Sequence, residues 1–128
     1  MKKILVVEDN DRHCQEILKQ LKGLGDVVHV KSYRGAAKAL RDEEFDLIVC
    51  DHNINMFEDD PNSWGQGTDV YFHLRFMTDK DDVMFIHYSS EPCPEKYDAE
   101  DDKLFKSFHK VVGFDLRKEV LELFKDRN

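Results

Sequence analysis

Short hydrophobic segments alternate along this chain with segments whose apolar residues recur at helical spacing. Three of the hydrophobic segments are nearly continuous, as expected for strands that helices cover on both faces. This alternation is typical of βα units built around a parallel sheet. We therefore predict five strands, at Ile4–Val7, Val27–Val30, Leu47–Cys50, Val83–Tyr88 and, less hydrophobic than the others, around Phe108–Val112.

Four further segments have the caps and apolar stripes of amphipathic helices. The first would end at Gly23 and Gly25, because glycine commonly terminates a helix. The four caps, in chain order, are Asn10 or Asp11, then Ser32, Thr68 and Asp115. The corresponding apolar stripes are Cys14, Ile17, Leu18 and Leu21; Ala36, Ala37 and Leu40; Val70, Tyr71, Leu74 and Met77; and Leu116, Val120, Leu121 and Phe124.

Two stretches fit neither pattern. Residues 91–103 contain Pro92 and Pro94 and few apolar side chains, so any helix there would be short or irregular. The long connection His52–Gly67 is rich in Asn, Asp and Gly, and connections of this length are usually functional or mobile. Five parallel strands with right-handed crossovers predict an α/β fold, a three-layer (βα)5 flavodoxin-like sandwich with strand order 2-1-3-4-5.

The composition indicates one soluble domain spanning residues 1–128, long enough for a single substantial core. Charged residues make up 36% and hydrophobic residues 41%, which argues against disorder. The net charge of −8 argues against direct nucleic-acid binding. The apolar runs are too short to span a membrane and form no export signal, so we expect a cytoplasmic protein. The three cysteines have no metal-ligand spacing, and Cys50 is predicted to be a core thiol.

Acidic residues follow two of the predicted strands. Glu8 and Asp9 come directly after the first strand, and Asp51 comes directly after the third. In the predicted strand order these strands are neighbours, and ligands of such sheets bind beyond the carboxyl ends of the strands. Three carboxylates in one place are costly unless a divalent cation binds them or their pKa values shift. The pattern therefore predicts a functional site at this edge.

Residues Lys3–Asn10 and Leu47–Asn53 resemble the first and third strands of the receiver domains of two-component response regulators, and the resemblance spans essentially the whole chain. It implies that Asp51 accepts a phosphoryl group. It also implies that Mg²⁺ binds Asp9, Glu8 (directly or through water), Asp51 and the backbone carbonyl of Asn53. The chemistry is consistent, because Mg²⁺ prefers hard oxygen ligands and neutralises charge while a carboxylate attacks phosphorus.

The fourth predicted strand extends this resemblance. It ends at Ser89, where the family has a hydroxyl residue that hydrogen-bonds the phosphoryl group, and Ser90 matches the small residue that follows. Asn53 and Glu91 match positions that tune the rate of dephosphorylation in the family. The other predicted elements bring no metal-binding histidine cluster, because the histidines have no ligand spacing. Only His52, beside Asp51, is interpreted as a side chain that responds to phosphate charge.

Two features depart from the family pattern. The connection after Asp51 lacks the usual Met-Pro step and carries an insertion of roughly eight residues before Gly67, with Glu58, Asp59, Asp60 and Trp64. The family also has a lysine at the end of its fifth strand. One alignment places Val112 there, with His109 as the switch side chain; another places Lys110 there. We favour Lys110, because the chemistry requires a cation, whereas Val112 would couple phosphorylation poorly to conformational change.

The chain ends at Asn128, just past the last predicted helix, so we expect either a stand-alone receiver without an output domain, like the chemotaxis regulators, or a fragment of a longer protein. By the family resemblance, its phosphodonor partner would be a histidine kinase or phosphotransfer protein, and it would signal to an unidentified downstream protein, with no membrane or nucleic acid involved. It would not be an enzyme beyond phosphorylating and dephosphorylating its own aspartate. Two alternatives remain. One is a degenerate receiver that binds proteins independently of phosphorylation. The other is an aspartate-nucleophile phosphatase, which the adjacent acids and Asn53 disfavour.

Overall fold

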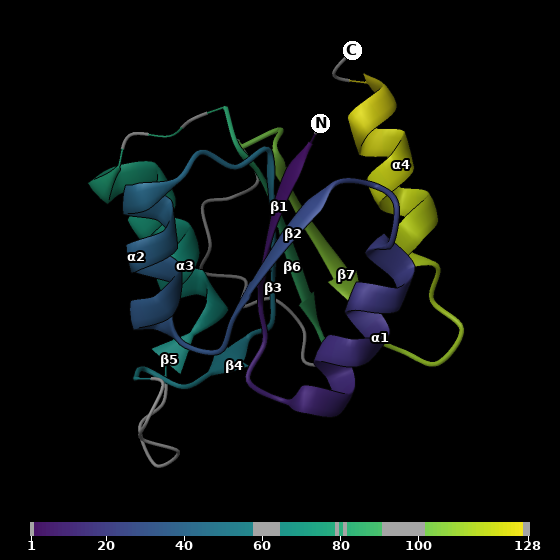
Figure 1. The fold of residues 1–128 in the computed structure, drawn as a ribbon, viewed down its shortest axis with the longest axis horizontal. Coiled ribbons are helices and arrows are strands. Elements are labelled where there is room, and N and C mark those ends of the chain that lie inside the picture. Colours follow the sequence, from purple (N-terminus) through teal and green to yellow (C-terminus); the bar gives the residue numbers. More distant parts are fainter. Residues whose placement is uncertain (1, 58–64, 79, 81, 91–101, 127–128) are drawn as a thin grey trace.

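The computed structural model describes residues 2–57, 65–78, 80, 82–90 and 102–126. Strands and helices alternate along the chain, as the hydrophobic pattern predicts (Figure 1). The elements are β1 (Lys3–Val7), α1 (Asp11–Leu21), β2 (Asp26–Val30), α2 (Tyr33–Asp42), β3 (Leu47–Cys50), β4 (Asn53–Ile54), β5 (Gly65–Gln66), α3 (Gly67–Phe72), the π-helix η1 (His73–Met77), β6 (Met84–Ser89), β7 (Phe105–His109) and α4 (Leu116–Asp126).

Five parallel strands form the central sheet in the order β2-β1-β3-β6-β7, which confirms the predicted order. Helices α1 and α4 cover one face of this sheet, and α2 and α3 cover the other (Figure 1). Val7 pairs with Cys50, Cys50 with His87, and Ser89 with His109. The carboxyl ends of β1, β3, β6 and β7 therefore meet at one edge of the sheet.

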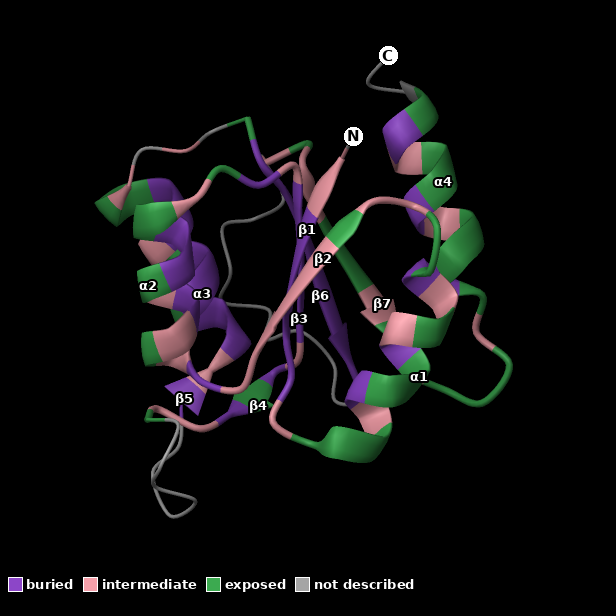
Figure 2. Cartoon of the chain, viewed as in Figure 1, coloured by how far each residue is buried: buried purple, intermediate pink, exposed green. Residues whose placement is uncertain are grey.

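Alternating residues of the central strands pack into two hydrophobic cores, one on each face of the sheet (Figure 2). Because successive residues of each central strand are buried on opposite faces, the strands are continuous hydrophobic segments in the sequence. The core under α2 and α3 takes Leu5, Val7, Ile48, Cys50 and Phe85 from the sheet. The core under α1 and α4 takes Ile4, Val6, Leu47, Val49 and Ile86.

The fifth strand lies earlier in the chain than predicted. Strand β7 begins at Phe105, whose ring stacks on Phe85 with centroids 5.7 Å apart, and it ends at His109. Val111 and Val112 lie beyond the last strand pair and are exposed. The predicted range Phe108–Val112 was therefore wrong, because this edge strand is anchored by an aromatic contact rather than by a hydrophobic run.

Three of the four predicted helix caps are confirmed. The side chains of Asn10, Ser32 and Asp115 accept hydrogen bonds from backbone N–H groups in the first turns of α1, α2 and α4. The prediction for Thr68 was wrong, because α3 begins earlier and Gln66 is its N-cap. Among the described residues, no helix is long and apolar enough to cross a membrane.

The third helix changes its winding after Phe72 and continues as the π-helix η1. The N–H of Thr78 donates to the carbonyl of His73, five residues earlier, at 3.1 Å. The wider turn buries Leu74 and Arg75 and leaves Met77 75% exposed. The prediction that Met77 belongs to the core stripe was therefore wrong, because it assumed ordinary helical spacing. Leu121, also assigned to an apolar stripe, is 46% exposed.

The long connection after β3 is folded where the structure describes it. Strands β4 and β5 pair antiparallel, with Asn53 opposite Gln66. The carbonyl groups of Asn55 and Met56 accept hydrogen bonds from the first N–H groups of α2, at 2.8 and 3.1 Å. Residues 58–64 of the insertion, including Trp64, lie outside the described residues.

Candidate functional site

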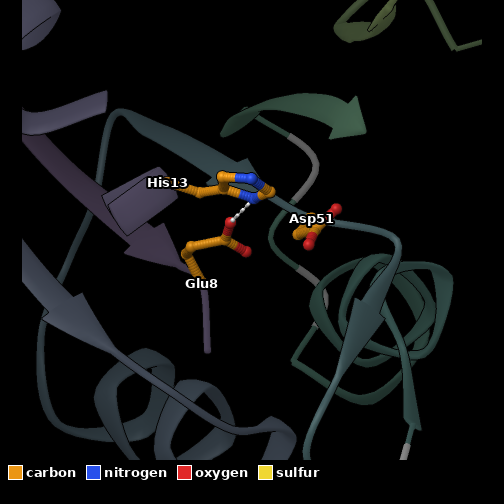
Figure 3. A group of neighbouring side chains, drawn as sticks. All are labelled: Glu8, His13 and Asp51. Carbon is orange, nitrogen blue, oxygen red and sulfur yellow. Dashed lines mark hydrogen bonds and ion pairs between the residues drawn. The ribbon is translucent and has the colours of Figure 1, made fainter. Parts of the chain in front are cut away.

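Three side chains from different elements converge at the carboxyl edge of the sheet (Figure 3). Glu8 follows β1, His13 lies on α1 and Asp51 follows β3, and one ligand atom of each lies within 4.8 Å of the other two. The Nδ1 atom of His13 is 3.1 Å from Oε1 of Glu8. Glu8 is fully buried, whereas the side chain of Asp51 is 13% exposed. Acids that follow β1 and β3 thus lie close together, as predicted. The cluster also contains His13, which was not predicted to belong to it.

Lys110 supplies a cation to this acidic cluster. Its Nζ atom is 3.1 Å from Oε1 of Glu8 and 3.6 Å from Oδ1 of Asp51. Its backbone N–H donates to the carbonyl of Ser89 at 2.8 Å, which fixes it directly beyond the end of β7. Val112, the alternative, is fully exposed on the following connection. The structure therefore places Lys110, and not Val112, beside Asp51.

Glu8 has an unusual electrostatic environment. Burial, and then the neighbouring Asp51, raise the pKa of Glu8 to about 9, although Lys110 acts in the opposite direction. Its Oε2 atom is buried and has no hydrogen-bond partner among the described residues. A divalent cation would give this oxygen a partner and favour the charged carboxylate. Two carboxylates with such an orphaned oxygen are a donor set that fits Mg²⁺.

Two backbone arrangements hold Asp51 in place. The N–H of His52 donates to Oδ1 of Asp51 at 2.8 Å and orients the carboxylate. The N–H of Gly67 donates to the carbonyl of His52 at 2.6 Å, and a Cβ atom at Gly67 would overlap the carbonyl oxygen of Asp51. Only glycine allows this approach, which explains why the connection returns to the site through Gly67.

A buried pair of histidines lies behind Asp51. His52 is 5% exposed and His87 is fully buried, and Nδ1 of His52 is 3.0 Å from Nε2 of His87. The Oγ atom of Ser107 on β7 lies 3.3 Å from the other ring nitrogen of His87. Burial, and then the neighbouring His52, lower the pKa of His87 to about 4. Sequence reasoning missed this pair, although the strand register, which sets Cys50 opposite His87, brings His87 close to His52.

The sequence matches no family model and no curated protein. Solved structures do match. The Mg²⁺–BeF complex of response regulator TrrA from Thermotoga maritima is 23% identical, with a TM-score of 0.69, over 96% of this chain and 98% of that one. TrrA in complex with histidine kinase ThkA is 21% identical, with a TM-score of 0.70, over 96% and 97% of the two chains. Chemotaxis regulator CheY4 of Vibrio cholerae is 20% identical, with a TM-score of 0.71, over 98% of each chain. The chain has the receiver-domain fold.

The receiver fold confirms the fold class that the sequence predicts, and the remaining site residues can be located within it. Asp9 is partly buried, and burial followed by the charge of Asp51 raises its pKa, but it is not a member of the close cluster. Asn53 is exposed on β4. Ser89 ends β6 and is buried beside the backbone of Lys110. The metal-binding and phosphoryl-binding roles of these residues stay predictions.

Two predicted switch or tuning residues, His109 and Glu91, remain to be located. His109 is the last residue of β7 and is exposed, and its Nε2 atom is 3.0 Å from the carbonyl oxygen of Ser90. This contact ties the ring to the backbone of Ser90, the residue that follows β6. Glu91 lies outside the described residues.

Proposed function

We propose that this chain is a phosphate-accepting receiver, in which Asp51 takes a phosphoryl group from a phosphohistidine on a partner protein. The observation that carries the proposal is the convergence of Glu8, Asp51 and Lys110 at one sheet edge, with Lys110 Nζ 3.6 Å from Asp51. The receiver fold supports it, since one similar structure is a Mg²⁺–BeF complex and another includes a histidine kinase.

The Asp51 carboxylate acts as the nucleophile. One of its oxygens forms a bond to phosphorus while the phosphorus–nitrogen bond of the phosphohistidine breaks. The histidine nitrogen keeps the electron pair and takes a proton. The N–H of His52 holds the attacking carboxylate in position, and the Lys110 ammonium stabilises negative charge on the transferring group.

Glu8 and Asp51, with Asp9 and the carbonyl of Asn53, would hold Mg²⁺. The ion, when bound, neutralises charge on the phosphoryl oxygens. The hydroxyl of Ser89 would then hydrogen-bond a phosphoryl oxygen. The added negative charge would draw Lys110 away from Glu8, which biases a two-state switch. Slow hydrolysis of the phosphorylated aspartate, catalysed by the site itself, would reset it.

A hollow of about 420 Å³ beside the site gives a partner room to approach. It lies between α1 and the connection from β7 to α4, and its lining includes His13, Lys110, Val111 and Phe114. An apolar hollow that borders Lys110 suits a partner helix that carries the phosphohistidine. We propose that the histidine kinase or phosphotransfer protein binds here, within the cytoplasm.

Incubation with Mg²⁺ and acetyl phosphate tests the proposal. We expect intact-mass spectrometry to show the addition of one phosphoryl group, which is lost in Asp51→Asn and without Mg²⁺. Asp46→Asn is the matched control, because Asp46 precedes the same strand at its opposite end and should leave incorporation unchanged. Absence of the adduct would refute the proposal and favour the phosphorylation-independent binding module, whereas equal incorporation into Asp51→Asn would show that a residue other than Asp51 accepts the phosphoryl group.

A further inference from the structure

Exposed hydrophobic side chains gather on the α2–α3 side of the molecule. The structure describes seven large hydrophobic residues that are 44% or more exposed, and four of them belong to η1, the end of α3 and the start of the insertion. These four are Phe57, Phe72, Phe76 and Met77. The rings of Phe72 and Phe76 contact each other, with centroids 5.5 Å apart. A contiguous apolar patch on a charged domain indicates a binding surface.

The π-helix places this patch on the surface. An ordinary helical turn would carry Met77 toward the core behind Leu74, but the wider turn leaves Phe76 71% and Met77 75% exposed. Arg75 secures the wider turn from inside, because its Nε donates to Asp102 at 2.8 Å and its Nη1 donates to the carbonyl of Lys80 at 2.6 Å. π-Helical turns are rare and are frequent at functional sites.

Two adjoining hollows turn the patch into a groove between α2 and η1, and they share Tyr33, His73 and Met77. The larger is about 1120 Å³ and is open to solvent. Its apolar wall includes Ala37, Leu40 and Phe57. The smaller is lined by Met56, Asp69, Phe72 and Phe76 besides the shared residues. We call these two hollows together the α2–η1 groove.

The rim of the larger hollow is basic, although the chain as a whole carries a net charge of −8. Among the described residues, its lining contains one acid, Glu44, and four cationic residues: Arg34, Lys38, Arg41 and Lys80. Lys80 and Arg41 are partly neutralised by Glu44 and Asp42, at 3.5 and 3.2 Å. Arg34 lies over the ring of Phe57, 5.7 Å from its centre, so a cation and an apolar surface are presented together.

We propose that the α2–η1 groove binds an amphipathic helix of a partner protein whose apolar face is flanked by acidic side chains. The apolar side chains would pack between Met77 and Phe57, and the acidic ones would pair with Arg34 and Lys38. The charge of the rim selects an acidic segment over a basic one. This surface lies on the opposite face of the sheet from the hollow proposed for the phosphodonor, so the inference does not depend on phosphorylation.

Fluorescence anisotropy with labelled peptides tests this on the full chain. The probe is a designed amphipathic helix with leucines at i, i+3, i+4 and i+7 and glutamates beside them; the comparison peptide has lysines in place of the glutamates. We expect the glutamate peptide to bind more tightly. Met77→Ser and Lys38→Glu should each weaken its binding about tenfold, which is ~1.4 kcal/mol. Lys38→Glu should also reduce the preference for the glutamate peptide.

Leu121→Ser and Lys118→Glu are matched controls, because both residues are exposed on α4, across the sheet. They should leave peptide binding unchanged, and all four variants should still accept phosphate from acetyl phosphate. Equal binding of both peptides, or unchanged binding in Met77→Ser and Lys38→Glu, would overturn the proposal. Concentration-dependent dimerisation that Met77→Ser abolishes would overturn it in favour of a second copy of this chain.

Discussion

The buried histidine pair makes the stability of this protein depend on pH in a way that one substitution should remove. His87 is fully buried, contacts His52 at 3.0 Å and Ser107 at 3.3 Å, and has a pKa of about 4 in the folded protein. His87→Gln keeps a polar side chain near both partners but cannot titrate. We predict that this variant loses part of the acid sensitivity of the protein.

The sign and size of the pH effect on stability follow from the difference between the pKa of His87 in the folded protein and in the unfolded chain. At pH values above the ordinary histidine pKa of 6.5, His87 is neutral in both the folded and the unfolded protein, so it does not make stability depend on pH there. Between pH 6.5 and about 4 the unfolded chain binds a proton that the folded protein does not, so stability falls as the pH falls. The whole difference between the two pKa values corresponds to ~3 kcal/mol of stability, of which ~2 kcal/mol is lost between pH ~7 and pH ~4.5.

Urea unfolding followed by circular dichroism at those two pH values measures the effect. The loss of stability on acidification should be smaller in His87→Gln than in the unsubstituted protein by ~2 kcal/mol. The raised pKa of Glu8 makes stability fall as pH rises, but this contribution is common to both proteins and cancels in the difference. His109→Gln, on the exposed end of β7, should behave like the unsubstituted protein. Identical acid sensitivity in His87→Gln would show that His87 is not held neutral.

Three further predictions concern the site. Gly67→Ala should destabilise the fold by ~2 kcal/mol or more in urea unfolding, because its Cβ meets the Asp51 carbonyl; Gly113→Ala, with positive φ but open space, should cost about 1 kcal/mol. Mg²⁺ affinity, measured by calorimetry, should rise with pH up to about 9 as Glu8 loses its proton, and Glu8→Gln should weaken binding and abolish this slope. Lys110→Met should slow phosphate incorporation from acetyl phosphate, and a rate equal to that of the unsubstituted protein would contradict its assigned role.

The sequence predicts those parts of the fold that continuous burial determines. Strands β1, β3 and β6 are buried on both faces, so their hydrophobic runs mark them within one residue. Strand β7 lies at the sheet edge and has no fully buried residue, and its position depends on the contact between Phe105 and Phe85. A contact of this kind is long-range, so local hydrophobicity does not reveal it.

The candidate site also contains some residues that the sequence predicts and others that it does not. The acids are found from sequence because each follows a strand whose ends the hydrophobic pattern fixes. The choice between Lys110 and Val112 depends on where β7 ends, which the sequence leaves open. The contact between His52 and His87 requires the register of β3 and β6. The π-helix is not predicted because a helical apolar stripe is recognised by its period of 3.6 residues, whereas the wider turn moves Met77 out of that stripe.

A chain of contacts joins the α2–η1 groove to the site at Asp51. Asp102 binds Arg75 of η1 and Tyr71 of α3, at 2.8 and 2.6 Å, and its carbonyl accepts the N–H of Phe105 at the start of β7. The other end of β7 leads directly to Lys110. A phosphoryl group that moves Lys110 and a helix that binds beside Arg75 would therefore act on opposite ends of one strand.

Any such coupling must be reciprocal, because it is a free energy shared between two binding events. Contiguity alone does not demonstrate it, so the prediction is quantitative. With Mg²⁺ and beryllofluoride, the affinity for the glutamate peptide should change about fivefold or more, which is ~1 kcal/mol. Asp102→Asn keeps the size of the side chain but weakens its pairing with Arg75, so the peptide should still bind without beryllofluoride while the ratio of the two affinities falls toward one. An equal ratio in Asp102→Asn and the unsubstituted protein would show that β7 does not connect the two sites.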